Sequence, residues 1–329
     1  MILAGDVGGT KVNLALYEVE KRGLSPKIFD SFHSREYASL EALVRDFIAG
    51  HQLKVDYACF GIAGPVKKGR AHVTNLPWVA DTQELVRALG LKQVWLINDL
   101  EANAHGIAGL APEDFVELNR GDDGAVGSIA IISAGTGLGE AGLLWDANRH
   151  LAIPSEGGHA DFAPRTDLDM ELSRCLRAGL GQVSWEHVLS GPGLLRIYEF
   201  LRDTGRGKEP AWLTEEFRRT DPPVAITAAA LEGKCELCVQ TLDIFVTYYG
   251  AEAANLALKM LATGGVYVGG GIAPKIIKKL QDGTFLKAFI GQNRMKNLLA
   301  AMPVRVIMNE KTALIGAARY AALQSGKIL

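Results

Sequence analysis

The chain opens with Ile2-Leu3-Ala4-Gly5-Asp6-Val7-Gly8-Gly9-Thr10, where a short apolar segment runs into a glycine-rich turn. This pattern predicts a strand that ends in a tight turn, and the apolar residues at 12–17 predict the strand that follows. The same design returns where residues 128–133 run into Ala134-Gly135-Thr136-Gly137-Leu138-Gly139 and another apolar segment follows at 141–145. Each turn contains a Gly-Thr step, so the sequence indicates an internal duplication with one copy in each of two domains.

The rest of the first third of the chain alternates between strand and helix signals. Apolar segments at 55–62 and 94–97 predict buried strands, while Ser39 and the pair Asp81 and Glu84 are typical of helix starts. Alternating strands and helices indicate an α/β fold with parallel strands in its sheet. The length of 329 residues fits two domains. The polar, Gly- and Asp-rich segment 113–127 is interpreted as a linker.

Composition excludes several classes of protein. Hydrophobic residues make up 48% and charged residues 22%, which is ordinary for a globular protein and excludes a disordered or fibrous one. With 35 Lys and Arg against 37 Asp and Glu, the chain has no charge imbalance suited to nucleic acid or an anionic membrane. We expect a soluble, cytosolic protein, because neither a signal peptide nor a membrane-spanning apolar run is found. Four cysteines do not form a disulfide framework in a chain of this length.

A third glycine turn, Gly269-Gly270-Gly271, follows an apolar segment at 266–268, which in turn follows a predicted long helix at 237–261. Glycine leaves backbone N–H groups open to phosphate oxygens, because no side chain blocks the approach. The first turn alone is equally well interpreted as a hairpin turn without a ligand, but three such turns favour a nucleotide site. Their spacing fits neither a P-loop nor a dinucleotide-binding turn. The candidate phosphate-binding residues are Gly8, Gly9, Thr10, Lys11, Gly135, Thr136, Gly137, Gly269, Gly270 and Gly271.

Asp6 stands in the first turn, where phosphates would lie. A carboxylate repels phosphate unless a divalent cation stands between them, so we interpret Asp6 as a ligand of Mg²⁺, directly or through water. Asn98 and Asp99 follow the apolar segment 94–97, at the end of a strand where open α/β sheets place ligand-binding groups. Asp99 is ionised at neutral pH and can accept a proton from a hydroxyl. The alternative is that it caps the helix that follows.

The string Glu156-Gly157-Gly158-His159 combines a carboxylate and an imidazole that could hydrogen-bond to neighbouring hydroxyls. The alternative is a loop with an incidental histidine, and a zinc site lacks two further ligands. Glu186, judged from its neighbours alone, fits a solvated helix start. Cys235 and Cys238 are interpreted as core or surface thiols, because one pair cannot complete a zinc site.

Together these strings resemble the bacterial ATP-dependent glucokinases of the hexokinase and actin-like ATPase superfamily, over essentially the whole chain. The first phosphate motif of that superfamily resembles residues 3–10, its second resembles 131–139, and its adenosine motif resembles 266–274. Strings typical of glucokinases stand at 97–99, 156–164 and 186–193.

The resemblance implies a two-domain actin-like ATPase (ribonuclease H-like) fold with an interdomain cleft. Residues 1–110 and about 312–329 would form a small α/β domain, and 111–311 a large one. The reaction implied is transfer of the γ-phosphate of ATP to the 6-hydroxyl of glucose, with Mg²⁺. Asp99 would be the general base, and Asn98, Glu156, His159 and Glu186 would bind glucose. A homodimer is also implied.

Other interpretations are weaker. ROK sugar kinases, or hexose kinases of broader specificity, are the main alternative. Lys11 favours the ROK family, because ROK kinases share the string Asp-x-Gly-Gly-Thr-Lys, whereas close relatives of the bacterial glucokinases often have Asn at this position. Residues 160–174 contain no cysteine, although ROK proteins normally have a cysteine-rich zinc motif after the Gly-His pair. A sugar-responsive repressor does not fit the near-neutral charge. A chaperone-like ATPase does not account for Asn98, Asp99 and the Glu/His set. The sequence leaves open the choice among hexoses, between ATP and polyphosphate, and any regulation.

Overall fold

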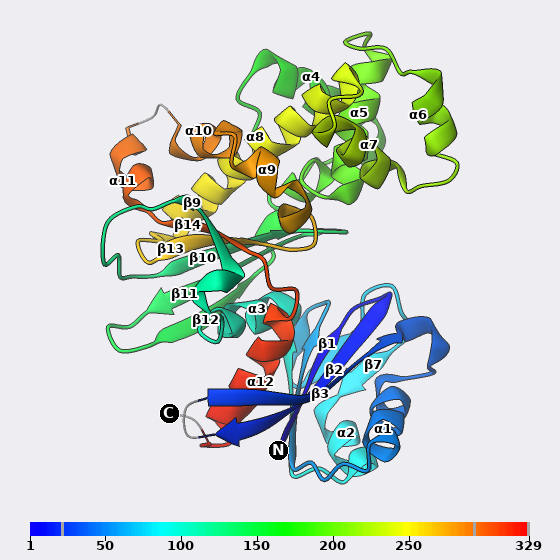
Figure 1. The fold of residues 1–329 in the computed structure, drawn as a ribbon, viewed down its shortest axis with the longest axis vertical. Helices are drawn as coiled ribbons and strands as arrows, with labels where there is room; N and C mark the ends of the chain where they lie inside the picture. Colours follow the sequence, from blue (N-terminus) through cyan, green and yellow to red (C-terminus); the bar gives the residue numbers. More distant parts are fainter. Residues whose placement is uncertain (21–22, 292–293, 328–329) are drawn as a thin grey trace. The chain divides into compact units, whose positions relative to one another are not determined.

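The structure, a computed structural model, describes residues 1–20, 23–291 and 294–327 (Figure 1). The chain divides into two compact units: unit 1 consists of Met1–Pro112 and Asn309–Leu329, and unit 2 consists of Glu113–Met308. Each unit is built of helices around a β-sheet, so the α/β class predicted from the sequence is confirmed.

Unit 1 contains both ends of the chain. Its strands are β1 (Ile2–Val7), β2 (Lys11–Glu20), β3 (Gly23–His33), β4 (Tyr57–Ile62), β5 (Val66–Lys67), β6 (Arg70–His72), β7 (Val79–Asp81) and β8 (Gln93–Asn98). Its helices are α1 (Leu40–Gly50), α2 (Thr82–Leu89), α3 (Asp99–Ile107) and α12 (Thr312–Gln324), with a 3-10 helix η1 (Ser34–Glu36).

The main sheet of unit 1 has the strand order β3-β2-β1-β4-β8. β1 is antiparallel to β2 and parallel to β4, which is parallel to β8. A second, three-stranded sheet has the order β5-β6-β7. The strand–turn–strand predicted from the first residues and the parallel strands that follow it are therefore confirmed.

Helices cover both faces of this sheet (Figure 1). Leu3 packs in one cluster with residues of α1 and α2, whereas Ile2 and Ala4 pack with the small residues of α12 on the other face. These residues of β1 lie on opposite faces of the sheet because successive side chains of a β-strand point in opposite directions. A Cβ atom on Gly316 of α12 would collide with the Ala102 carbonyl oxygen of α3. The small residues of α12 therefore allow this helix to pack closely against α3.

Unit 2 is one continuous stretch of chain. Its strands are β9 (Phe115–Asn119), β10 (Ile129–Ala134), β11 (Leu138–Trp145), β12 (His150–Ser155), β13 (Gly265–Gly269) and β14 (Val304–Ile307). Its helices are α4 (Asp167–Leu180), α5 (Gly191–Asp203), α6 (Ala211–Glu216), α7 (Pro222–Leu231), α8 (Glu236–Met260), α9 (Ile277–Leu280), α10 (Thr284–Ile290) and α11 (Lys296–Ala301). The 3-10 helices are η2 (Pro112–Asp114), η3 (Gly157–His159), η4 (Trp185–His187) and η5 (Ala273–Ile276).

The six-stranded sheet of unit 2 has the order β12-β11-β10-β13-β14-β9. Its first five strands repeat the pattern of unit 1: β10 is antiparallel to β11 and parallel to β13, and β13 is parallel to β14. The internal duplication is therefore confirmed at the level of topology. The predicted long helix is α8, which packs against β10, β11 and β13 and fills the core with its buried side chains.

The prediction of a linker at 113–127 is wrong for part of that segment. β9 lies within it and pairs antiparallel with β14 at the edge of the sheet, with one register shift. Val116 and Leu118 pack against the core of unit 2, while Glu117 between them is exposed. An edge strand needs partners on one side only, so two apolar residues in polar surroundings suffice to anchor it.

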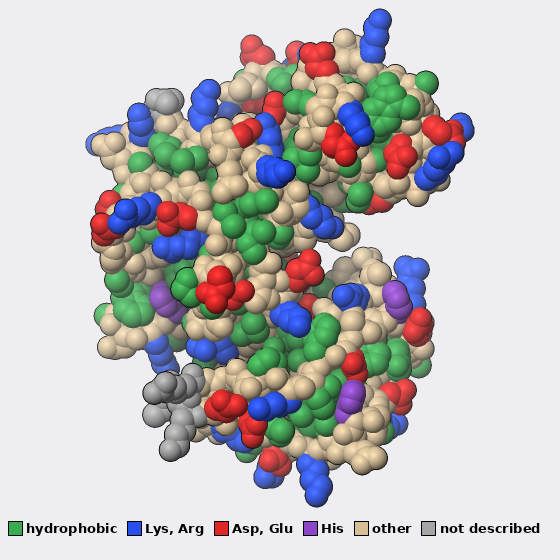
Figure 2. Space-filling model, in the orientation of Figure 1, with side chains coloured by type: hydrophobic (Ala, Val, Ile, Leu, Met, Phe, Trp, Pro, Cys, Tyr) green, Lys and Arg blue, Asp and Glu red, His purple; other side chains and the backbone are tan. Residues whose placement is uncertain are grey.

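The surface matches the near-neutral composition. Acidic and basic side chains are interspersed over the face in Figure 2. Within the described residues, no helix is both long and apolar enough to cross a membrane.

Candidate functional site

The parallel strands of unit 1 bring the predicted residues of that unit to one edge of the sheet. Val7 pairs in register with Ile62, and Ile62 with Asn98. Because parallel strands end at the same edge, the first glycine turn and the Asn98–Asp99 step lie at this edge together.

Asp6 is half-buried near the end of β1. Its Oδ2 atom accepts a long hydrogen bond from Asn13 Nδ2, at 3.4 Å. Burial raises the pKa of Asp6, and the hydrogen bond from Asn13 and the charge of Lys11 offset this rise only in part. The ionised carboxylate is therefore incompletely compensated, which is a suitable environment for a divalent cation.

The first glycine turn is held by hydrogen bonds from its own backbone and from β3–η1. Gly8 N donates to Lys11 O at 3.0 Å, and Ser34 Oγ donates to Gly8 O at 2.8 Å. A Cβ atom on Gly9 would lie 2.5 Å from Thr74 O, so this position requires glycine. Thr10 and Lys11 are exposed next to it.

Asn98 and Asp99 form the junction between β8 and α3. Asn98 is the N-cap: its Oδ1 accepts from Leu100 N at 2.9 Å, and its Nδ2 donates to Gly64 O at 3.2 Å. Asp99 is the first residue of the helix, and its Oδ1 also lies 2.9 Å from Leu100 N. The capping position that we considered for Asp99 thus belongs to Asn98.

The second and third glycine turns lie side by side in unit 2. β10 and β13 are parallel neighbours, with Ser133 opposite Gly269. The buried hydroxyl of Tyr249 joins the two strand ends, since it accepts from Ala134 N at 3.1 Å and donates to Gly269 O at 2.9 Å. Gly270 has φ +82° and packs against the Ala134 backbone, where a side chain would collide. The two turns therefore form one preassembled surface.

Glu186 of η4 reaches the second turn from a distant part of the chain. Its Oε2 accepts from Leu138 N at 2.9 Å, and its Oε1 lies 3.9 Å from His159 Nδ1. The side chain is 30% exposed, so the interpretation of Glu186 as a solvated helix start is wrong. A Cβ atom on Gly137 would lie 2.5 Å from Glu186 Oε2, so glycine there makes room for this carboxylate.

Residues 156–159, called the 156–159 turn below, contain η3 and lie beside η4. His159 N donates to Glu156 O at 3.0 Å, and both side chains are exposed. Gly158 is buried against the Leu138 backbone, where no side chain fits. The glycine pair therefore presents Glu156 and His159 to solvent while the backbone between them is packed.

The structure thus groups the predicted residues into two sets. Unit 1 brings together Asp6, Gly8, Gly9, Thr10, Lys11, Asn98 and Asp99. Unit 2 brings together Gly135, Thr136, Gly137, Glu156, His159, Glu186, Gly269, Gly270 and Gly271. Sequence reasoning missed the Tyr249 hydroxyl, because its partners are far away in the sequence and the helical pattern shows only that the residue faces the core.

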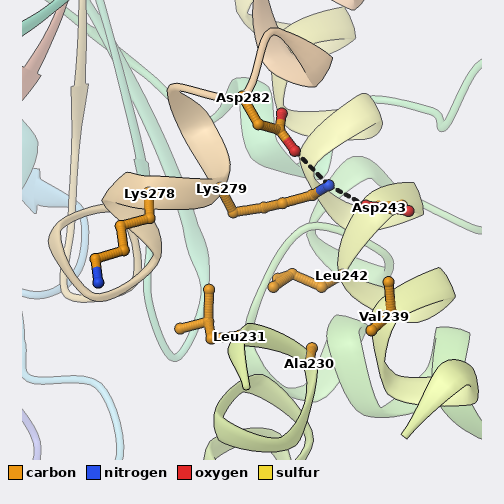
Figure 3. Close-up of a pocket in the computed structure, with 8 residues that line it drawn as sticks. All are labelled: Ala230, Leu231, Val239, Leu242, Asp243, Lys278, Lys279 and Asp282. Carbon is orange, nitrogen blue, oxygen red and sulfur yellow. Dashed lines mark hydrogen bonds and ion pairs between the residues drawn. The ribbon is translucent and has the colours of Figure 1, made fainter. Parts of the chain in front are cut away.

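Two other features lie outside these sets. Cys235 and Cys238 are both buried in the core of unit 2. A pocket of about 210 Å³ lies among α7, α8 and α9 (Figure 3), where Lys279 lies between Asp243 and Asp282, with its Nζ 2.6 Å from Asp282 Oδ2. None of the predicted site residues lines this pocket.

Comparison with known proteins gives consistent matches along the chain. A family model described as glucokinase matches residues 3–324. A curated glucokinase from Nostoc punctiforme is 42% identical over 337 aligned positions, which cover 98% of this chain and 99% of that protein. The crystal structure of a glucokinase from an Antarctic psychrotroph matches with a TM-score of 0.84 and 31% identity, covering 98% of both chains. A ROK family glucokinase from Streptomyces griseus, solved with glucose and AMPPNP, matches in fold with a TM-score of 0.66 and 22% identity, covering 98% of this chain and 99% of that one.

Proposed function

The chain belongs to the glucokinase family and is an ATP-dependent kinase of glucose, and we propose that Asp99 is the general base of this reaction. Asp99 follows a buried parallel strand, and the Asn98 cap fixes the backbone on which it stands. In the transfer, the 6-hydroxyl oxygen of glucose attacks the γ-phosphorus of ATP and the bond to the β-phosphate oxygen breaks. Asp99 accepts the hydroxyl proton, a role worth about 10²–10⁴ in rate.

Glucose recognition is assigned to Asn98, Glu156, His159 and Glu186. A carboxylate accepts from a sugar hydroxyl, and an imidazole or an amide can donate or accept. Glu186 Oε1 and His159 Nδ1 lie 3.9 Å apart, so neighbouring hydroxyls of one sugar could meet both groups. A sugar that lacks one hydroxyl would leave a polar group unpaired, which is the physical basis of selectivity.

The three glycine turns are proposed to bind the phosphates of ATP. Gly135, Thr136 and Gly137 stand beside Gly269, Gly270 and Gly271 because Tyr249 joins the two strand ends. Gly8, Gly9, Thr10 and Lys11 would contribute backbone N–H groups, a hydroxyl and a cation. Open N–H groups and a lysine stabilise the charge on the transferring phosphoryl group.

Mg²⁺ is proposed to accompany the nucleotide, with Asp6 as its protein ligand, directly or through water. The carboxylate of Asp6 fits this role, because burial raises its pKa and a long hydrogen bond from Asn13 leaves its charge largely uncompensated. The ion would neutralise charge on the phosphates. The protein's own contribution is to hold one carboxylate at the end of β1.

The decisive test of the base is Asp99→Asn. The amide keeps the size and hydrogen-bonding reach of the side chain but cannot accept the proton, so we expect kcat to fall by about 10²–10⁴ while the Kd for glucose changes by less than about twofold. Single-turnover kinetics and calorimetric titration with glucose measure the two quantities. A variant that turns over like the wild type contradicts the assignment.

A second assay tests substrate choice. Formation of sugar 6-phosphate is measured with glucose, mannose or glucosamine, and with ATP or polyphosphate as donor. With ATP as donor, ADP release is also measured with and without sugar. We expect ADP release to depend on glucose; sugar-independent release would indicate a chaperone-like ATPase.

We also propose that the enzyme is a cytosolic homodimer. Sedimentation of the purified protein tests the oligomeric state, and fractionation of cells tests the location.

A further inference from the structure

Two carboxyl side chains of unit 2 are buried against one another outside the residues assigned above. Glu140 of β11 is 1% exposed and Glu252 of α8 is 0% exposed. The two side chains interact directly. Two buried carboxylates that are both ionised would repel one another in a medium of low polarity, so one of them must be neutralised.

The hydrogen-bond donors around the pair are incomplete. Asn255 Nδ2 donates to Glu252 Oε2 at 2.7 Å, and Lys259 Nζ lies 3.8 Å from Glu252 Oε1. Within the part of the chain that the structure describes, Glu140 Oε1 and Glu252 Oε1 receive no hydrogen bond from a protein donor. A proton held between the two carboxyl groups supplies the missing donor and removes one of the two charges.

The surroundings indicate which residue carries that proton. Burial, and secondly the charge of Glu252, raise the pKa of Glu140 to about 8. Burial also raises the pKa of Glu252, but Asn255 and Lys259 oppose this rise by stabilising its charge. The shared proton is therefore assigned to Glu140, because Asn255 and Lys259 favour the charge on Glu252.

The Glu140 carboxyl group lies against the 156–159 turn. Glu140 is paired in register with Ser155, the residue before the turn, and Gly157 N donates to Ser155 Oγ at 2.9 Å. A Cβ atom on Gly157 would overlap Glu140 Oε2, so this oxygen touches the backbone of the turn. The Glu140 carboxyl group is therefore in contact with the backbone of the turn, so a displacement of this group affects the turn.

We propose that Glu140 and Glu252 form a proton-sharing carboxyl pair that positions the 156–159 turn for sugar binding. The inference rests on the proposed function, in which Glu156 and His159 bind glucose. Glu140 is a positioning residue, because it acts on the sugar through the turn. Loss of the shared proton leaves two buried negative charges, which separate and displace the turn.

Few other charged groups bear on the pair. Of the elements packed against β11, α8 supplies Glu252 and Lys259, and the turn itself supplies the exposed Glu156 and His159. β10 has no titratable side chain, and His150 of β12 is paired in register with Trp145 at the other end of β11.

The test is the pH dependence of glucose affinity, measured by calorimetry without nucleotide in the full-length protein. From about pH 7 to about pH 9.5 we expect the wild-type Kd for glucose to rise roughly tenfold. A change of this size follows if the pKa of the carboxyl pair differs by about one unit between the glucose-bound and the free protein. Glu140→Gln mimics the protonated side chain and cannot ionise. We expect its Kd to equal the wild-type value at about pH 7 within twofold and to stay level, so that at the alkaline end the variant binds glucose more tightly than the wild type.

Tighter binding by the variant at alkaline pH cannot result from misfolding. Glu117→Gln, the same change at an exposed position of the same sheet, should keep the wild-type pH dependence. A level wild-type profile, or a Glu140→Gln profile that still rises, overturns the inference. Glu156→Gln separates the two proposals. If this variant binds glucose as tightly as the wild type, the proposed sugar site fails. If it binds glucose more weakly, and the Kd of Glu140→Gln still rises with pH as in the wild type, only the proposal of the carboxyl pair is contradicted.

Discussion

The main sheets of the two units share the same order over five strands, but they supply their acidic groups differently. In unit 1, Asp6 and Asp99 stand at the ends of the sheet's own parallel strands. In unit 2, Glu186 and Glu156 come from segments that follow β12, and the glycine turns between β10 and β11 and after β13 carry no charge.

This difference separates two tasks. Side chains at strand ends are held by the sheet ladder, which suits groups that must align with a reacting phosphoryl group. Side chains on 3-10 turns and loops can change without disturbing the sheet, which suits groups that choose among sugars. The comparison predicts that substitutions at the unit 1 carboxylates lower kcat, whereas those at the unit 2 carboxylates weaken glucose binding.

A large loss of rate is expected for Asp6→Ala. Loss of the carboxylate proposed to hold the cation at the phosphates should lower kcat by about 10²–10³ and leave the Kd for glucose nearly unchanged. Steady-state kinetics over a series of Mg²⁺ concentrations, with calorimetry for glucose, measure both. Asp46→Ala, at an exposed position of α1, is the matched control. If Asp6→Ala weakens glucose binding instead, the division between the two units fails.

Glu186→Ala should weaken glucose binding by roughly 10- to 100-fold, because a sugar hydroxyl and Leu138 N both lose their acceptor. Calorimetric titration with glucose gives the value, and Glu232→Ala at the end of α7 serves as an exposed control. A fall in kcat without a change in glucose affinity would assign Glu186 to the chemistry and contradict the comparison.

Tyr249→Phe should lower the free energy of unfolding by about 1–3 kcal/mol, because Ala134 N loses its buried acceptor. Since the hydroxyl joins two turns assigned to phosphate, the KM for ATP should rise more than the KM for glucose. Denaturant unfolding and kinetics with each substrate varied provide the measurements. Equal increases in both KM values would indicate a general loosening of unit 2.

The last expected effect concerns the pH dependence of stability. The pKa of Glu140 rises from 4.5 to about 8 on folding, so above pH 4.5 the unfolded chain loses a proton that the folded chain keeps. Wild-type stability should therefore fall as the pH rises from about 4.5 to about 8. Glu140→Gln cannot ionise and does not lose stability in this way. At the alkaline end its Tm should therefore exceed that of the wild type, by roughly 2–4 °C for each kcal/mol of stability that the wild type has lost. Thermal unfolding across this range checks the sign.

Features that depend on a few neighbouring residues could be predicted from the sequence, whereas contacts between residues far apart in the chain could not. Asp6 and Asn98 lie at strand ends, where an apolar run followed by a polar residue is visible in a few positions. Glu186 accepts from Leu138 N across a separation of 48 residues, and no local pattern marks that contact. The apolar residues of β9 are few because an edge strand needs little burial, so the segment was taken for a linker.

The packing of α12 has a consequence for synthesis. This helix covers the face of the first sheet that carries Ile2 and Ala4, yet it is translated only after the whole of unit 2. Unit 2 is continuous and can complete its core while the ribosome is still at work. β1 and its neighbouring strands must wait with apolar side chains uncovered until α12 has been made, so chaperone contact with the nascent chain should concentrate on these strands.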